Sequence, residues 1–194
     1  MRFLALLLCA CLMAGCASKP DYYISPNPVT IPKTATYWID TFNVEVVGKN
    51  ERFLPDEKVR DQLHSDLIVR LLDGNRYADS KETADYLLDV DAVYTRRIQD
   101  TQGGFMNKIV ADGTYLASVD FSYQVKVKKA GAEVLHFAQA RQGLMPGGAV
   151  GQMHNMKSML GALTNKGNSD VEGYYTGQLS RFIADDLQAI PSRE

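Results

Sequence analysis

Carboxylates at Asp89, Asp91 and Asp120 are the first candidates for chemistry in this chain of 194 residues. Each stands in a segment of alternating polar and apolar residues, so the three could share one face of a sheet. Grouped carboxylates can hold a divalent cation or act as general acids. The alternative, which we expect, is that they are solvated residues on the outward face of an antiparallel sheet.

The three histidines do not have metal-ligand spacing. His64, His136 and His154 are far apart, and the HExxH pattern that puts two zinc ligands on one helix face is absent from the sequence. We expect His64 on a helix surface, His136 in a strand and His154 in a loop. The chain is predicted to hold no metal.

Signatures of common catalytic machinery are also missing from the sequence. There is no GxSxG elbow, no Walker loop and no GxGxxG, and Gly103-Gly104 fits a simple turn. We therefore predict that the chain is not an enzyme and uses no cofactor.

Basic residues gather near the ends of two expected strands. Arg96 and Arg97 end one strand, and Lys126, Lys128 and Lys129 end another. If these ends meet, they form a basic patch for lipid phosphates or an acidic partner; otherwise they are a solvated rim balanced by acids. The total of 21 basic and 23 acidic residues argues against nucleic acid as a partner.

The N-terminal residues have the composition of a targeting segment. Residues 1–15 read MRFLALLLCACLMAG, in which Arg2 precedes an apolar run of eleven residues, Phe3 to Met13. This run is too short to cross a bilayer as a helix, which takes about 20 residues. Residues 1–15 are therefore predicted to be a cleaved signal peptide rather than a membrane span.

The end of this run, Leu12-Met13-Ala14-Gly15-Cys16, resembles the bacterial lipobox, although Met13 stands where the lipobox favours Leu. The resemblance implies a mature chain that begins at Cys16, with thioether-linked diacylglycerol and an N-acyl chain such as palmitate. Two or three acyl chains anchor a protein stably, whereas one binds only marginally. Ala17, rather than Asp, after the cysteine implies sorting to the outer membrane.

The remaining cysteines agree with this interpretation. Cys9 and Cys11 lie in the discarded segment, so Cys16 would be the sole mature cysteine. We therefore expect no disulfide in the mature protein.

A proline-rich stretch follows Cys16. Residues 16–35 contain four of the seven prolines, which favour an extended backbone. Two roles remain open for it. The stretch could be a tether between lipid and domain, or part of it could pack along the domain through Tyr22, Tyr23 and Ile24.

Residues 36–191 are predicted to form one domain. Alternating apolar residues predict strands over 37–47, 86–95, 120–128 and 133–141, the last two joined by a turn. In the first strand, Trp38, Phe42, Val44 and Val46 are predicted to share one face.

Two helices complete the predicted pattern. The first covers residues 56–72 and is capped by Gly74, and the second starts at a capping box of Ser169 and Glu172 and stops at Pro191. A sheet with one apolar face needs cover, which two amphipathic helices can provide. The predicted fold class is α+β: a two-layer sandwich whose antiparallel or mixed sheet of four to five strands is covered on one face by two helices.

The order of these elements, with Trp38–Phe42 in a strand, Val59–Leu72 in a helix and Ala84-Asp85-Tyr86-Leu87-Leu88 leading the next strand, resembles the small α/β lipoproteins of Gram-negative envelopes. Members of this group are the lipopolysaccharide-assembly lipoprotein, the curli-secretion lipoprotein and the amino-terminal domain of TolB. The resemblance covers about residues 37–190, and it implies a fold more than a function.

Residues 143–168 are unusually rich in Gly and Met. Met153, Met156, Leu160 and Leu163 would share one face of a short helix. Because methionine adapts to varied apolar partners, this face could contact a partner protein or an acyl chain. Alternatively, it could cap the core of its own domain.

These patterns predict a lipoprotein anchored in the outer membrane of the cell envelope and facing the periplasm. It would act as a non-catalytic binding or accessory subunit in envelope assembly or transport, with an envelope protein as its partner. The alternative is a lipid-binding or lipid-transfer lipoprotein in which residues 143–168 close an apolar pocket between helix and sheet.

Overall fold

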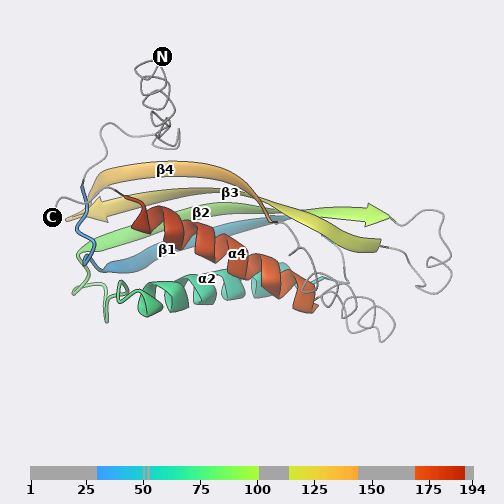
Figure 1. The fold of residues 1–194 in the computed structure, drawn as a ribbon, viewed down its shortest axis with the longest axis horizontal. Coiled ribbons are helices and arrows are strands. Elements are labelled where there is room, and N and C mark those ends of the chain that lie inside the picture. The colour runs from blue at the N-terminus through green and yellow to red at the C-terminus, as the bar shows by residue number, and fades with distance from the viewer. Residues whose placement is uncertain (1–29, 50, 52, 101–113, 144–168, 191–194) are drawn as a thin grey trace, which may run out of the picture.

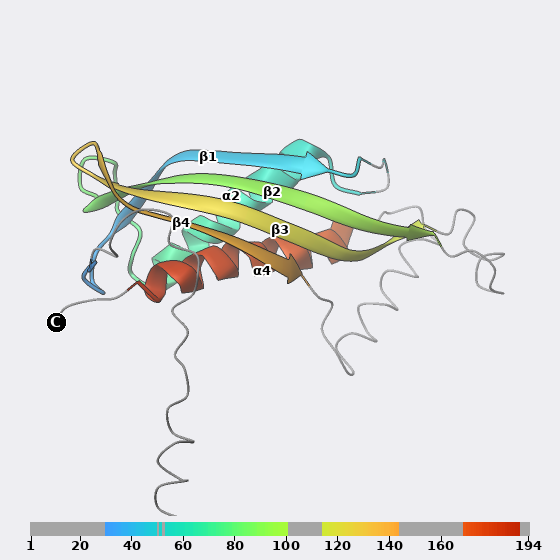
Figure 2. The same ribbon diagram turned by 90° about the horizontal axis from the view of Figure 1, so that it is seen from above.

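The computed structural model describes residues 30–49, 51, 53–100, 114–143 and 169–190 (Figure 1). Along these residues the elements are β1 (Tyr37–Val47), α2 (Asp56–Asp73), β2 (Tyr86–Asp100), β3 (Thr114–Lys129), β4 (Ala132–Gly143) and α4 (Ser169–Gln188). The sheet order is β1-β2-β3-β4, with β1 parallel to β2 and the other neighbours antiparallel. Both helices lie on one face of the sheet (Figures 1 and 2). The predicted α+β fold is confirmed, with a mixed sheet.

A β-bulge interrupts β1. The pairing with β2 skips Asp40, between Ile39 and Thr41. One extra residue reverses which side chains of a strand face a given side. Tyr37 and Ile39 are therefore buried before the bulge, and Val44 is buried after it.

The bulge makes one prediction wrong. Trp38 does not share a face with Val44 and Val46, because it lies on the other side of the bulge and pairs in register with Leu87. Its ring instead stacks on Tyr77, with 5.3 Å between the centroids.

The Ala84-Asp85-Tyr86 sequence fixes the start of the parallel pair. The Asp85 carboxylate accepts hydrogen bonds from the backbone N–H of Thr36 at 2.8 Å and from its hydroxyl at 3.1 Å. The backbone N–H of Tyr86 donates to the Thr36 carbonyl at 3.1 Å. This segment therefore holds β1 against β2 where the two strands begin.

Helix α2 ends at Gly74, whose N–H donates to the Arg70 carbonyl at 3.2 Å. The left-handed conformation that glycine usually adopts after a helix falls one residue later, at Asn75, with φ 53°. Asparagine is among the few other residues that adopt it readily.

The strands β2, β3 and β4 confirm the predicted alternation and extend beyond it. Tyr86, Leu88, Val90 and Tyr94 of β2 are all buried towards the helices. The β3–β4 turn places Ala130 at φ 50° and Gly131 at φ 81°, as a two-residue hairpin of the mirror-image type requires.

Packing between sheet and helices is tight where β4 ends. Gly143 is the last residue of β4 rather than the start of a separate segment. A methyl group on Gly143 would lie 2.8 Å from Tyr175 Cδ1 and 2.9 Å from Phe121 Cε2. Only glycine fits there without displacing an aromatic ring.

The core also includes residues that precede β1. Ile31 and Ala35 are 1% and 3% exposed. The last residues of the predicted tether are thus packed into the domain. Within the described part of the chain, no helix is long and apolar enough to span a membrane.

Candidate functional site

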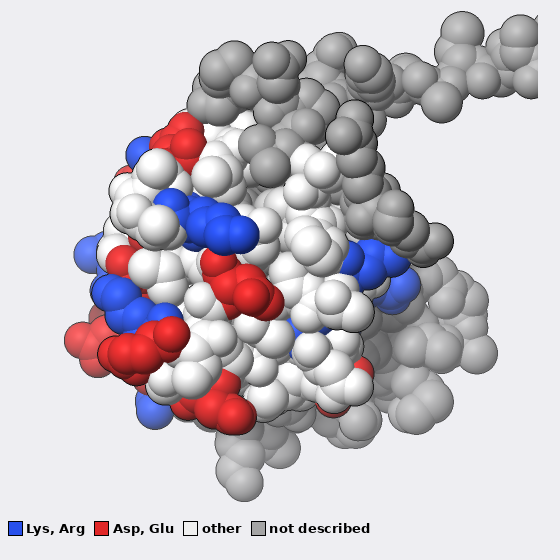
Figure 3. All heavy atoms as spheres, turned by 90° about the vertical axis from the view of Figure 1, so that its left-hand side faces the viewer, with Lys and Arg blue, Asp and Glu red and all other residues white. Residues whose placement is uncertain are grey.

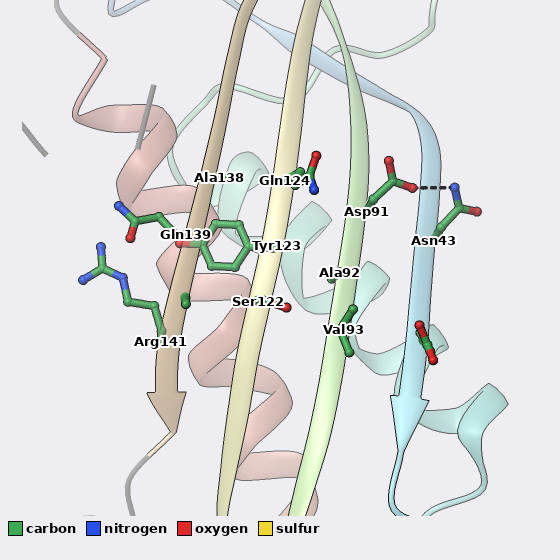
Figure 4. A pocket seen from close by; sticks show the side chains of 12 residues that line it. Asn43, Asp91, Ala92, Val93, Ser122, Tyr123, Gln124, Ala138, Gln139 and Arg141 are labelled. Carbon is green, nitrogen blue, oxygen red and sulfur yellow. Dashed lines mark hydrogen bonds between the residues drawn. The ribbon is translucent and has the colours of Figure 1, made fainter. Parts of the chain in front are cut away.

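The sheet face turned away from the helices presents polar side chains from every strand. Two neighbouring cross-strand rows run Asn43–Asp91–Gln124–Ala138 and Glu45–Val93–Ser122–Ala140. The small side chains of Ser122, Ala138 and Ala140 leave an open trough of about 900 Å³ along these rows (Figure 4). We call this surface the open face.

All three predicted carboxylates lie on the open face, but they do not form a cluster. The pairs are Asp89 with Lys128, Asp91 with Asn43 at 2.8 Å, and Asp120 with Arg97 at 2.6 Å. Asp120 is in register with Thr95, four residues along β2 from Asp91, which corresponds to about 13 Å. Among the described residues, no group of three or more His, Cys, Asp or Glu side chains could hold a metal ion.

The shifted pKa values show that Asp89 and Lys128 form an ion pair. Burial raises its pKa, but hydrogen bonds from Lys128 and Thr41 lower the pKa by more, so the net shift is downwards. The same hydrogen bond raises the pKa of Lys128. Both groups are therefore charged at neutral pH, and Asp89 is poorly suited to donate a proton.

Of the two interpretations of the basic residues, the patch is excluded because the two strand ends do not meet. Arg97 is in register with Ser118, whereas Lys126 is in register with Asp89, eight residues earlier on β2. That separation corresponds to about 26 Å along the strands. Arg96 lies on the helix side of the sheet and is only 5% exposed.

Two of the three histidines lie in the described residues, in the elements expected. His64 is on α2, with its ring 4.9 Å from the Phe42 ring. His136 is on β4, with Nε2 3.2 Å from Gln124 Oε1. Both histidines therefore make packing and polar contacts within the domain.

Arg96 is the centre of a buried polar cluster that sequence reasoning missed. Its Nε donates to Glu172 Oε1 at 2.6 Å, and its Nη2 donates to the Leu54 carbonyl at 2.5 Å. Glu172 Oε2 accepts the Leu54 N–H at 2.7 Å. The side chains of Arg96 and Glu172 are 1% and 0% exposed. The cluster joins β2, the start of α4 and the loop before α2.

Glu172 thus has a different role from the predicted capping box, because Arg96 and Leu54 engage both carboxylate oxygens. One signal for this role was present in the sequence. Arg96 continues the alternate positions of Tyr94 and the buried residues before it, and a buried arginine needs an acidic partner.

A second polar cluster lies beside the edge of β4. Asp186 of α4 is 6% exposed and accepts hydrogen bonds from the Tyr123 hydroxyl at 2.5 Å and from Arg141 Nη2 at 3.3 Å. Burial and the nearby Asp186 carboxylate raise the pKa of Tyr123. The Arg141 guanidinium also lies over the Phe182 ring.

Charge is mixed on the end of the molecule shown in Figure 3. Lys and Arg alternate there with Asp and Glu. This described face has no large patch of a single sign that would favour a strongly charged partner.

Several predicted site residues lie outside the described residues. They are Cys16, Met153, His154, Met156, Leu160 and Leu163. Lipidation at Cys16 and an apolar contact through residues 143–168 remain predictions.

Comparison with known proteins gives little information about function. No protein-family model and no curated protein matches the chain. Among solved structures, the PelC dodecamer from Paraburkholderia phytofirmans is similar with 12% identity and a TM-score of 0.41, covering 87% of this chain and 96% of PelC.

Two further solved structures are similar to this chain at comparable identities and TM-scores. A Caulobacter crescentus protein provisionally assigned as a lipoprotein has 16% identity, a TM-score of 0.34 and coverage of 75% of this chain and 87% of its own. A DUF330 protein from Xanthomonas campestris has 13% identity, a TM-score of 0.34 and coverage of 85% and 94%. At these TM-scores and identities the likeness carries no argument about function.

Proposed function

We propose that this protein is an outer-membrane lipoprotein, anchored through acyl chains on Cys16 and facing the periplasm, whose domain acts by binding another envelope protein. The observation that carries the proposal is the sequence MRFLALLLCACLMAGC at residues 1–16. It combines a positive start, an apolar run too short to span a bilayer, and small residues before a cysteine.

The contacts on the open face favour binding over catalysis. Asp91 and Asp120 accept hydrogen bonds from Asn43 and Arg97, and Asp89 is held by Lys128. Carboxylates used in this way connect neighbouring strands and present a polar, hydrogen-bonding surface. Such a surface suits a protein partner that brings its own polar groups.

The lipid-transfer alternative requires an apolar pocket between helix and sheet. In the described residues, that space is filled by packed side chains. Val59, Leu63 and Leu67 of α2 and Val90 and Val125 of the sheet are each at most 1% exposed. The core packing therefore favours a protein partner over a lipid cargo.

The anchor is tested by replacing Cys16 with Ala in the full chain. We expect the parent chain to incorporate labelled palmitate and to fractionate with the outer membrane. The Cys16→Ala chain should lose the label and leave the outer-membrane fraction.

Cys9→Ala is the matched control, because Cys9 lies in the segment predicted to be removed. It should retain both label and membrane location. Label in the Cys16→Ala chain, or the same membrane location for both variants, would overturn the proposed anchor.

A further inference from the structure

The two edges of the sheet differ in how their backbone is covered. The β1 edge is bonded by the chain itself at two places, Tyr37 and Val44. Tyr37 exchanges backbone hydrogen bonds with residues 76–78, at 2.8 Å from its N–H to the Arg76 carbonyl and at 2.9 Å from the Ala78 N–H to its carbonyl. Further along β1, Arg60 Nε donates to the Val44 carbonyl at 2.8 Å. The bulge at Asp40 further protects this edge.

The β4 edge lacks this cover between Ala138 and Gln142. Among the described residues, the backbone of this stretch bonds only to β3, with Ala138 in register with Gln124 and Ala140 with Ser122. The stretch contains no proline, and its pairing has no bulge. An edge of this kind is a template for a further strand.

We propose that residues 138–142 of β4 pair antiparallel with the same residues of a second copy of this chain, about a two-fold axis at Ala140. The two four-stranded sheets would then continue into one another. This inference does not depend on the lipid anchor.

A second copy fits this edge because the surface beside it is self-complementary. Pairing about Ala140 sets Gln139 of each copy opposite Arg141 of the other, and Ala138 opposite Gln142, so that no like charges face each other. Ala140 itself is exposed and small, so two copies can approach closely.

The neighbouring part of α4 supports the same symmetry. Gln142 shares a groove of about 630 Å³ with Arg181, Phe182 and Asp185. Arg181 and Asp185 form an exposed ion pair within α4, with Arg181 Nε 3.4 Å from Asp185 Oδ2 and side chains 67% and 56% exposed. A two-fold axis perpendicular to the sheet makes the two α4 helices antiparallel, so each copy presents these opposite charges in reverse order to the other.

The arrangement also closes. Among the described residues, β1 is bonded at two places and carries a bulge, whereas β4 offers an uninterrupted edge over residues 138–142. Pairing through this same edge on both copies gives a dimer rather than an open filament.

Ala140→Cys in the full-length chain tests this pairing in isolated envelopes under mild oxidation. A residue on the two-fold axis faces itself at a Cα–Cα distance of about 4.5–5.5 Å, which a disulfide can bridge. We expect a covalent homodimer that reductant converts to monomer.

Glu45→Cys is the matched control, since Glu45 is exposed and ends the same cross-strand row at the β1 edge. It should form no covalent dimer under the same oxidation, and neither should the parent chain. Three results would overturn the pairing: no dimer with Ala140→Cys, equal dimer with Glu45→Cys, or a disulfide that joins the Ala140→Cys chain to a different protein.

Loss of the interface gives an independent readout. Ala140→Lys sets two like charges opposite each other on the axis, so the sedimentation mass of the purified lipidated chain should halve, whereas Glu45→Lys should leave it unchanged. A parent chain that already sediments as a monomer would contradict the proposal.

Discussion

The two faces of the sheet use charge in different ways. On the helix-covered face, Arg96 and Glu172 are buried, and each makes several hydrogen bonds to groups from distant parts of the chain. On the open face, Asp120 meets Arg97 in an ion pair whose side chains are 32% and 62% exposed. Two consecutive residues of β2 thus differ in role: Arg96 is a buried connector, and Arg97 is a solvated surface group.

This difference separates stability from recognition. Removing one partner of a buried pair leaves an uncompensated charge in a low-dielectric interior, whereas water replaces a lost partner at the surface. We therefore expect substitutions on the covered face to affect folding and those on the open face to affect contacts with other molecules.

The largest effect is predicted for Glu172→Gln. The neutral amide removes the buried counter-charge of the Arg96 guanidinium and leaves only the partly exposed Asp56 carboxylate, 3.5 Å from Arg96 Nη1. The loss should be near the lower end of about 3–5 kcal/mol in the free energy of unfolding. Urea unfolding followed by circular dichroism measures this loss. In the double variant Arg96→Met/Glu172→Leu, much of the stability should return, and a loss below about 1 kcal/mol in the single variant would make the cluster unimportant.

Alkaline pH probes the same face through its tyrosines. Burial raises the pKa of Tyr37 and of Tyr175 to about 12. Because the unfolded chain loses these protons near pH 10, stability is complete below pH 10 and falls as pH rises towards 12, by roughly 2–3 kcal/mol for each tyrosine. Absorbance of tyrosinate against pH should show these groups titrating about two units above exposed tyrosines. Ionisation of all tyrosines near pH 10 in the folded protein would contradict the packing.

Gly143→Ala tests the close approach of β4 to α4. Its methyl group would meet the Tyr175 and Phe121 rings at under 3 Å, so we expect a loss of about 1–3 kcal/mol. Gly173→Ala is the control, because that position in α4 has open space for a methyl group and should gain about 0.5–1 kcal/mol. Equal thermal midpoints for the two variants would show that the packing at Gly143 is loose.

The smallest effect on stability is predicted for Asp120→Asn on the open face. Its pair with Arg97 is solvated, so the free energy of unfolding should change by less than about 1 kcal/mol in urea titrations. The triple variant Asp89→Asn/Asp91→Asn/Asp120→Asn should keep the fold and the membrane anchor but weaken capture of the envelope partner. A folded, correctly anchored triple variant that captures the partner as well as the parent chain does would contradict a role of these carboxylates in binding.

Local periodicity was sufficient to predict most of the architecture. The alternation from Tyr86 to Tyr94 and the helical spacing from Val59 to Leu71 each place one apolar stripe against the other layer, and the structure has both. The bulge at Asp40 could not be predicted from periodicity. Apolar residues flank it on both faces of the strand, so the sequence does not show where the buried face changes sides.

The polar clusters were harder to predict because they depend on distant contacts. Glu172 meets Arg96 across 76 positions of sequence, and a local capping box explained the same residue equally well. The separation of Arg97 from Lys126 required the β2–β3 register, which the alternation alone does not specify. The open-face carboxylates were predicted on one face, but their individual partners followed from that register.

The most direct test of the account is cross-linking of the lipidated chain in intact envelopes, followed by identification of the proteins and lipids captured. We predict a defined membrane-protein partner, with its capture reduced when residues of the open face are replaced and the fold is retained. A chain captured alone, or with lipid and no protein partner, would contradict the proposal that this domain acts by binding another protein.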